Sequence, residues 1–281
     1  MKTRILDDGR LELTMRQSSF GTFGICQERA RRENLEGAVQ VDTDAAVVGT
    51  CVHAAIELDL SDRAAGGDGY SYDTLYDVFV EEWRDWSSRP SFRHVKYTDD
   101  SAIRWGALCL HHWYEGIREQ LDPLEVEWGF NFQVYEDDAS VIRYSGTCDL
   151  IDRNFGLVDW KTSGRGPYQE WEKQRWAAQP TIYTQAYHYY QLGTGQPTSE
   201  VYDFTYGVMY AKGIQVFRVQ RGPEEWAWQL EKAKDVLRLI QTDQPSWPRN
   251  DEHSLCSPLW CGEWATCKGA FLTSDDPWRK S

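Results

Sequence analysis

The sequence predicts an α/β protein with a mixed β-sheet, and two observations support this. The pattern of apolar residues changes at Glu125, from helical stretches before it to short strands after it. The predicted elements then follow the order helix, strand meander, helix, strands and helix, without an internal repeat. With 281 residues, of which 41% are hydrophobic, the chain can bury a sizeable core. We expect a single domain spanning residues 1–281.

Helices dominate the expected structure before Glu125. Ser18 and Ser19 are good N-cap residues for a helix that continues through Cys26 to about Arg32. The glycine-rich run at 64–69 should end a second helix, and the helices after it are expected to form a helical insertion. The other expected elements are a strand at 11–15, helices at 46–60, 72–86 and 101–121, and an insertion spanning about 70–121.

The segment of about 125–220 is expected to form the central sheet. Its first three strands follow one another as a meander, which changes to a helix and then to two more strands. The clearest helix comes last, because its apolar residues recur at i, i+4, i+7, i+11 and i+14. The expected elements are strands at 126–137, 141–153, 156–163, 201–210 and 213–220, helices at 176–191 and 223–242, and a cysteine-rich segment at about 245–281.

Composition and charge exclude some classes of protein. A net charge of −14 disfavours a protein that coats nucleic acid through bulk positive charge, although a nuclease cleft must itself hold carboxylates. No apolar run approaches the length of about eighteen residues that a membrane span needs. The first residues lack the apolar stretch of a secretory signal. We therefore expect a cytoplasmic protein that does not bind membranes.

Three charges lie in a predicted β-hairpin, GTCDLIDRNFGLVDWKTS, at residues 146–163. Asp159 and Lys161 are two residues apart on the second strand, so both point to one face of the sheet. Strand pairing would bring Asp149 near Asp159, and two adjacent carboxylates are costly unless a divalent cation neutralises them. Lys161 would then hold an attacking water or steady a phosphate. The alternative is that these charges decorate the sheet edge, as we expect of Asp152 in the turn.

Two pairs of residues spaced by one helical turn accompany the hairpin. His53 and Glu57 lie at i and i+4 in an otherwise apolar helix, so an imidazole and a carboxylate share one face. Downstream, Gln179 and Tyr183 have the same spacing in AAQPTIYTQAYHYY. We favour this pair over a second one because it lies nearer the expected start of the helix. The second pair is Gln185 and Tyr189.

These residues resemble the motifs of the PD-(D/E)XK nucleases, and more narrowly those of the RecB-like branch, which includes CRISPR-associated and phage exonucleases. In that family a histidine is followed by G-x-x-D, then (D/E)-x-K, then Q-x-x-x-Y on a helix. Here GTCVH, GTCD, DWK and QPTIY occur in that order. The resemblance implies a restriction-endonuclease-like core and a DNA exonuclease that depends on Mg²⁺ or Mn²⁺.

The resemblance also implies a role for each matching residue. Lys161 would position or activate the hydrolytic water, while Gln179 and Tyr183 would line the DNA path and support the lysine. Glu57 would be an outer partner of His53 or of a metal-bound water, and Glu127 is a weaker candidate on the preceding strand. The implied metal ligands are His53, Asp149, Asp159 and the backbone carbonyl of Trp160.

Three of the seven cysteines crowd into twelve residues of loop-like sequence, which points to a metal. Cys256, Cys261 and Cys267 need a fourth ligand, and His253 would complete a zinc site. Some members of the nuclease branch hold a 4Fe–4S cluster with one N-terminal and three C-terminal cysteines, which implies Cys26 as the fourth ligand here. The first two C-terminal cysteines are separated by four residues rather than the family's two. Zinc, and no metal, therefore remain alternatives to the cluster.

Basic residues near aromatic ones are candidates for DNA contacts. The segment SSRPSFRHVKY, at 87–97, combines both kinds and could bind a single strand, or it could be a solvated loop. A second group follows Lys161 and is better placed to meet a DNA backbone. A third, weaker group lies at 29–32. The candidates are Arg89, Arg93 and Lys96 in the first group, and Arg165, Lys173 and Arg175 in the second.

The combined prediction is a metal-dependent DNA exonuclease that acts on single-stranded DNA or free ends, in recombination, repair or phage DNA processing. Its cellular setting would be a bacterium or a phage-infected host cell. A separate helicase or recombination partner, and an oligomer, are compatible with the sequence. The alternatives are a catalytically inactive DNA-binding or assembly module and a structural zinc protein.

Overall fold

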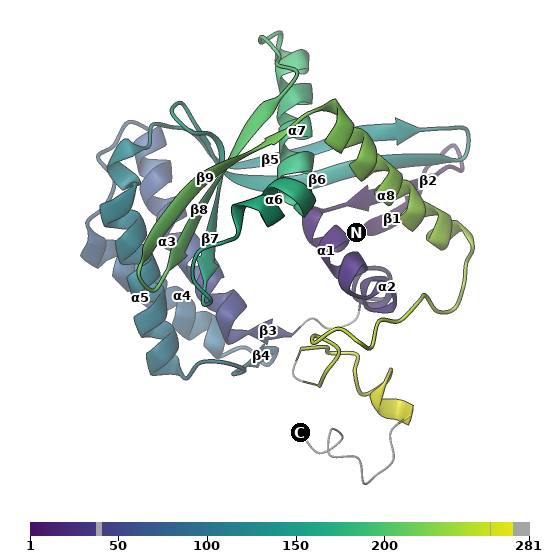
Figure 1. Cartoon of the computed structure of the whole chain (residues 1–281), viewed down its shortest axis with the longest axis horizontal. Coiled ribbons are helices and arrows are strands. Elements are labelled where there is room, and N and C mark those ends of the chain that lie inside the picture. The colour runs from purple at the N-terminus through teal and green to yellow at the C-terminus, as the bar shows by residue number, and fades with distance from the viewer. Residues whose placement is uncertain (38–40, 259, 272–281) are drawn as a thin grey trace. The chain divides into compact units, whose positions relative to one another are not determined.

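The structure, a computed structural model, describes residues 1–37, 41–258 and 260–271 (Figure 1). The chain forms two compact units, and each unit combines segments that are distant in sequence. The first unit consists of residues 1–41, 131–146 and 224–281, and the second of 42–130 and 147–223. Strands β5 (Pro123–Glu136) and β6 (Ser140–Asp152) contribute residues to both. Within the described ranges, no helix is long and apolar enough to cross a membrane.

In the first unit, short strands pair with the beginning of β6. The β1–β2 pair is antiparallel, and β2 runs parallel to β6, with Leu11 opposite Ser140 and Met15 opposite Tyr144. Its elements are β1 (Lys2–Ile5), β2 (Leu11–Met15), α1 (Gln17–Ile25), α2 (Gln27–Leu35), α8 (Pro223–Gln241) and η2 (Gly269–Phe271).

In the second unit, the end of β6 leads into a four-stranded arrangement. The β6–β7 and β8–β9 pairs are antiparallel and the β7–β8 pair is parallel, which confirms the predicted mixed sheet flanked by helices. Its elements are β3 (Asp42–Thr43), α3 (Asp44–Ala64), α4 (Tyr72–Ser87), β4 (Phe92–Arg93), α5 (Asp99–Gly116), η1 (Arg118–Gln120), β7 (Gly156–Ser163), α6 (Glu170–Trp176), α7 (Ala178–Thr194), β8 (Tyr202–Tyr210) and β9 (Gly213–Arg221).

Two predicted helices are each divided in two. The helix expected through Cys26 stops there, because Cys26 is extended, with φ −158° and ψ 117°. Gly21 and Gly24 weaken the preceding helix. The helix expected over 176–191 becomes α6 and α7, separated at the extended Ala177. Pro180 lacks the N–H that a continuous helix would need at that point, and it lies in the first turn of α7 instead.

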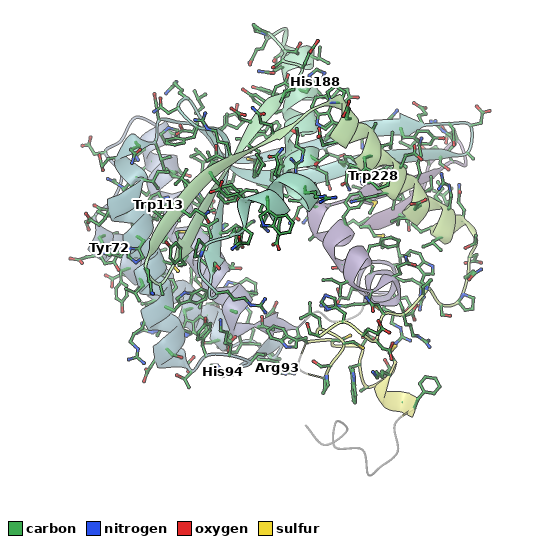
Figure 2. The ribbon with its side chains drawn as sticks, viewed as in Figure 1. Tyr72, Arg93, His94, Trp113, His188 and Trp228 are labelled. Atoms are coloured by element: carbon green, nitrogen blue, oxygen red, sulfur yellow. The ribbon has the colours of Figure 1, made fainter. Side chains whose placement is uncertain are left out.

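The core of the second unit holds the β6–β7 hairpin in place. Helices α3, α4 and α5 bury a large apolar cluster that includes Trp113 on α5 (Figure 2) and Trp160 on β7. The two indole rings meet edge to face, with centroids 6.1 Å apart. A side chain on Gly207 of β8 would collide with the Trp160 ring, so the neighbouring strand has room for Trp160 only because it carries glycine there. Burial of a large side chain contributes roughly 2–3 kcal/mol, and Trp160 is 1% exposed.

Candidate functional site

The predicted hairpin forms, and its two strands separate at the candidate residues. The ladder between β6 and β7 runs from Asp152 opposite Gly156 to Leu150 opposite Val158. Beyond it, the backbone N–H of Trp160 donates to Oδ2 of Asp149 at 2.8 Å. A carboxylate thus replaces a strand partner at this point. Because side chains alternate along β7, Trp160 enters the core while Asp159 points to the other face.

Asp152 is not the exposed turn charge that the sequence suggested. Its side chain is buried, with 3% exposure. Oδ1 accepts N–H groups of Asn154 and Phe155 at 2.8 and 3.0 Å, and Oδ2 accepts the N–H of Asp122 at 2.7 Å. The expectation was wrong because it considered only the charge of Asp152. An aspartate in a turn commonly accepts hydrogen bonds from the backbone amides that follow it. Asp152 therefore anchors the hairpin turn.

Asp149 faces the helix that carries the candidate histidine. Nδ1 of His53, on α3, lies 3.4 Å from Oδ2 of Asp149. Burial raises the pKa of Asp149 to about 6, Asp159 adds to the rise, and His53 and Lys161 oppose it. Because burial disfavours the ionised form of Asp149, a cation bound beside it would stabilise its carboxylate.

Two further carboxylates lie near His53 and Asp149. Glu57, one turn beyond the histidine on α3, is exposed, and Glu127 lies on β5. Glu127 is exposed, yet partial desolvation, followed by the carboxylates of Asp149, Glu57 and Asp159, raises its pKa to about 7. Glu127 also has a φ of 52°, a left-handed conformation that is uncommon outside glycine. The weaker candidate on β5 is therefore part of the same acidic group.

Asp159 is the centre of a buried polar chain. It is 2% exposed, its Oδ1 accepts from Nε2 of Gln179 at 2.5 Å, and its Oδ2 pairs with Nζ of Lys161 at 2.5 Å. Burial would lower the pKa of Lys161, but Asp159 and Asp149 raise it above its ordinary value. Lys161 is therefore a stable ammonium, suited to stabilising negative charge rather than to accepting a proton.

The structure distinguishes between the two glutamine–tyrosine pairs of α7. Gln179 contacts Asp159, and the pKa of Tyr183 is raised by burial and by Asp159. Oε1 of Gln185 is buried and has no hydrogen-bond partner among the described residues. Tyr189 is 43% exposed. Gln179 of the first pair therefore meets the hairpin residue Asp159.

The side chains of Asp149, Asp159 and His53 suit a hard divalent cation, since they are carboxylates beside an imidazole. In the part of the chain that the structure describes, no group of three or more His, Cys, Asp or Glu side chains is arranged to hold a metal as it stands. Asp159 is instead neutralised by Lys161. The residues fit a Mg²⁺ or Mn²⁺ site in chemistry.

Two of the candidate DNA contacts are occupied by their own segment. Arg89 pairs with Asp85, with Nη2 and Oδ2 2.5 Å apart, and lies over the Trp86 ring. Nη1 of Arg93 on β4 (Figure 2) donates to the carbonyls of Pro90 and Phe92 at 2.7 Å.

The remaining candidates lie on the surface or near Lys161. Arg165 and Arg175 are exposed. Nζ of Lys173 lies 4.3 Å from the ring centroid of Tyr168, and its pKa is lowered by burial and by Lys161. Lys96 is exposed, with Nζ 4.8 Å from the ring centroid of Tyr97.

A second candidate site lies within the first unit. One pocket there is lined by four of the free cysteines together with basic residues of α2 and the C-terminal segment. His253 is not among the lining residues, and its Nδ1 accepts the N–H of Leu255 at 3.1 Å. Part of the expected segment 245–281, namely 259 and 272–281, lies outside the described residues. The cysteines of the pocket are Cys26, Cys256, Cys261 and Cys267.

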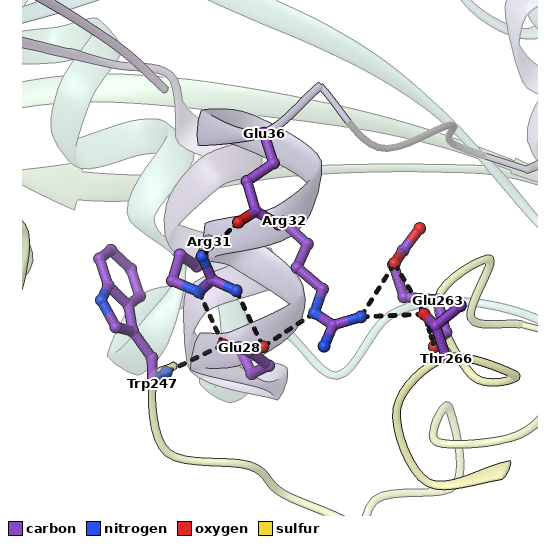
Figure 3. Close-up of polar contacts among 7 residues, drawn as sticks. All are labelled: Glu28, Arg31, Arg32, Glu36, Trp247, Glu263 and Thr266. Atoms are coloured by element: carbon purple, nitrogen blue, oxygen red, sulfur yellow. Dashed lines mark hydrogen bonds and ion pairs between the residues drawn. The ribbon is translucent and has the colours of Figure 1, made fainter. Parts of the chain in front are cut away.

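A network of ion pairs connects the walls of this pocket (Figure 3). Glu28, 1% exposed, accepts from Arg31 and Arg32 at 2.8–3.0 Å and from the N–H of Trp247 at 2.9 Å. Nη1 of Arg32 continues to Oε2 of Glu263 at 3.1 Å. Burial alone would raise the pKa of Glu28, but these partners lower it to about 2.

The arginines at 29–32 are therefore structural, because each pairs with a glutamate of its own helix. Sequence reasoning missed Glu28, although its spacing of three and four residues from two arginines was a detectable signal.

Comparison with known proteins adds a family and a fold. A family model described as the PD-(D/E)XK nuclease superfamily matches residues 15–268. No curated protein matches the chain. The crystal structure of a candidate exonuclease from Eubacterium rectale has a TM-score of 0.52 at 10% identity, covering 94% of this chain and 90% of that one. The crystal structure of SSO0001 has a TM-score of 0.35 at 18% identity, covering 84% of this chain and 89% of that one. The first of these shares the fold.

Proposed function

The chain belongs to the PD-(D/E)XK nuclease superfamily, and from this premise we propose that it is a divalent-metal-dependent DNA exonuclease. One observation carries the proposal: the β6–β7 hairpin places Asp149 beside His53, and Asp159 between Lys161 and Gln179. An inert DNA-binding module has no need of a partly buried lysine, a buried carboxylate and an amide in contact beside further carboxylates. The fold shared with the candidate exonuclease supports the choice of exonuclease.

The residues would divide the chemistry as follows. His53, Asp149, Asp159 and the Trp160 carbonyl would hold Mg²⁺ or Mn²⁺, which when bound lowers the pKa of water and polarises a phosphoryl oxygen. Lys161, a stable ammonium, would orient the attacking water and stabilise the charge that develops on the phosphate.

The glutamine–tyrosine pair would act behind these groups. Gln179 fixes the orientation of the Asp159 carboxylate through its 2.5 Å hydrogen bond, and Tyr183 supports Gln179. DNA contacts would come from Arg165, Lys173, Arg175 and Lys96. We place the activity in recombination, repair or phage DNA processing.

The test is digestion of end-labelled linear DNA, single- and double-stranded, with Mn²⁺ or Mg²⁺. Wild type should release short products from the ends and spare circular single-stranded DNA. Lys161→Ala and Asp149→Asn should lose at least about 100-fold in rate, in line with the loss of one charge-stabilising group. Lys212→Ala, which removes an exposed lysine between β8 and β9, is the matched control. Equal rates for all four proteins would refute the catalytic assignment, and cleavage of circles would refute the exonuclease assignment.

We further propose that Cys26, Cys256, Cys261 and Cys267 hold a 4Fe–4S cluster. The support is that one pocket is lined by all four, and that thiolates are the usual ligands of such a cluster. The cluster would be structural, since it joins residues 230 apart (256 − 26) within one unit. Broad visible absorption with matching iron and sulfide, lost in Cys26→Ser, is the expected result. A colourless protein containing zinc would overturn it.

A further inference from the structure

A fully buried aspartate holds a loop of the second unit in a fixed conformation. Asp44 is the first residue of α3 and is 0% exposed. Its Oδ2 accepts three consecutive backbone N–H groups, from Val95, Lys96 and Tyr97, at 2.8, 2.7 and 2.6 Å. Three amides converging on one carboxylate oxygen leave this stretch of backbone little freedom. The same helix carries His53 to the metal-site candidates.

The loop that Asp44 holds lies against the end of the catalytic strand. Gly164 directly follows β7, three residues after Lys161. A Cβ on Gly164 would collide with Nζ of Lys96 and would lie 2.6 Å from Oη of Tyr97. Three residues of extended chain span about 10 Å. The Lys96 ammonium is therefore within about one or two nucleotides of Lys161, which would face the reacting phosphate in the proposed function.

Lys96 is also chemically free to bind an anion. It is exposed, and no carboxylate lies within ion-pair distance of it among the described residues. Its position is nonetheless defined, because its ammonium lies over the Tyr97 ring. That ring stacks on Trp105, with centroids 5.0 Å apart and planes at 24°. In a chain with a net charge of −14, a fixed, unpaired cation beside the catalytic strand is unusual.

We propose that Lys96 binds a backbone phosphate of the DNA strand next to the one being cleaved, and that Asp44 is the positioning residue that keeps it there. The inference rests on the proposed nuclease function and names the residue that guides the strand. Lys96 acts on binding alone, so it contributes equally to the ground and transition states. Its loss should raise KM and leave kcat unchanged.

Two variants test the lysine by different routes. Lys96→Gln removes the charge. Gly164→Ala keeps the charge but displaces the ammonium. Its Cβ also presses on Oη of Tyr97, so its thermal stability is measured beside that of wild type. Both should raise KM for labelled single-stranded DNA about 5- to 20-fold with kcat within twofold. Both should also reduce the slope of log binding constant against log salt by about 0.7, the value for one phosphate contact on a single strand. Lys212→Gln should do neither.

Asp44→Ala tests the positioning role. Hydrogen exchange of the 95–97 amides should become faster, KM should rise as in Lys96→Gln, and the double variant should show no further rise, since both changes act on one contact. Additive effects, or a loss of thermal stability with unchanged KM, would overturn the role of Asp44. Wild-type KM and salt slope in both Lys96→Gln and Gly164→Ala would overturn the role of Lys96. Failure of wild type to cleave DNA would instead count against the proposed nuclease function, while the salt slope would still test Lys96.

Discussion

The carboxylate of Glu28 offers a prediction whose magnitude follows from the structure. Glu28 is buried and bonded to two arginines of its own helix and to the backbone of Trp247 (Figure 3). Glu28→Gln keeps the shape of the side chain but removes the charge. Arg31 and Arg32, whose side chains are 12% and 17% exposed, then lose their common anion. We expect the variant to be less stable near neutral pH.

The size of the loss comes from the pKa of Glu28, which is lowered from 4.5 to about 2. At about 1.36 kcal/mol for each pH unit, this corresponds to about 3 kcal/mol. A carboxyl with a lowered pKa stabilises the fold fully above about pH 4.5. That stabilisation is lost as the pH falls from there to about 2. The difference between wild type and variant should therefore shrink by about 60% between pH 6 and pH 3.

Urea unfolding followed by tryptophan fluorescence at pH 6 and pH 3 measures both quantities. Glu36→Gln is the matched control, because Glu36 pairs with the same Arg31 at 2.6 Å but is 54% exposed. Such a surface pair contributes about 0–1 kcal/mol. The reasoning fails if the two variants lose similar amounts of stability, or if the loss in Glu28→Gln is the same at both pH values.

Three further outcomes are expected. Gln179→Ala should lower kcat for release of end label about 10- to 100-fold by freeing Asp159, whereas Gln185→Ala should change kcat less than twofold. Asp152→Ala should lower the free energy of unfolding in urea by about 2–4 kcal/mol, because three amides lose their acceptor; a loss under about 1 kcal/mol would contradict its anchoring role. Mn²⁺ at about 100 times its Kd should stabilise wild type by about 2.7 kcal/mol in a thermal-shift assay and leave Asp149→Asn unchanged; an equal shift in both would place the metal elsewhere.

The sequence by itself determined the features that depend on local periodicity. Strand β2 begins and ends where it was predicted, at Leu11 and Met15. The period of two along β7 correctly separates Trp160, which enters the core, from Asp159 and Lys161 on the other face. These predictions succeed because a strand's alternation, and a turn's preference for certain residues, are properties of a few neighbouring residues.

Only the tertiary structure decided which of several similar residues meet. Gln179 and Gln185 lie on one helix, and the start of α7 at Ala178 sets which of them reaches Asp159. Asp152 and Asp149 are three residues apart, yet one anchors a turn and the other faces His53. The charge of the two aspartates, and the i, i+4 spacing of the two glutamine–tyrosine pairs, would be the same if their roles were exchanged. The difference arises from partners that are distant in sequence, which the chain acquires only when its strands and helices pack.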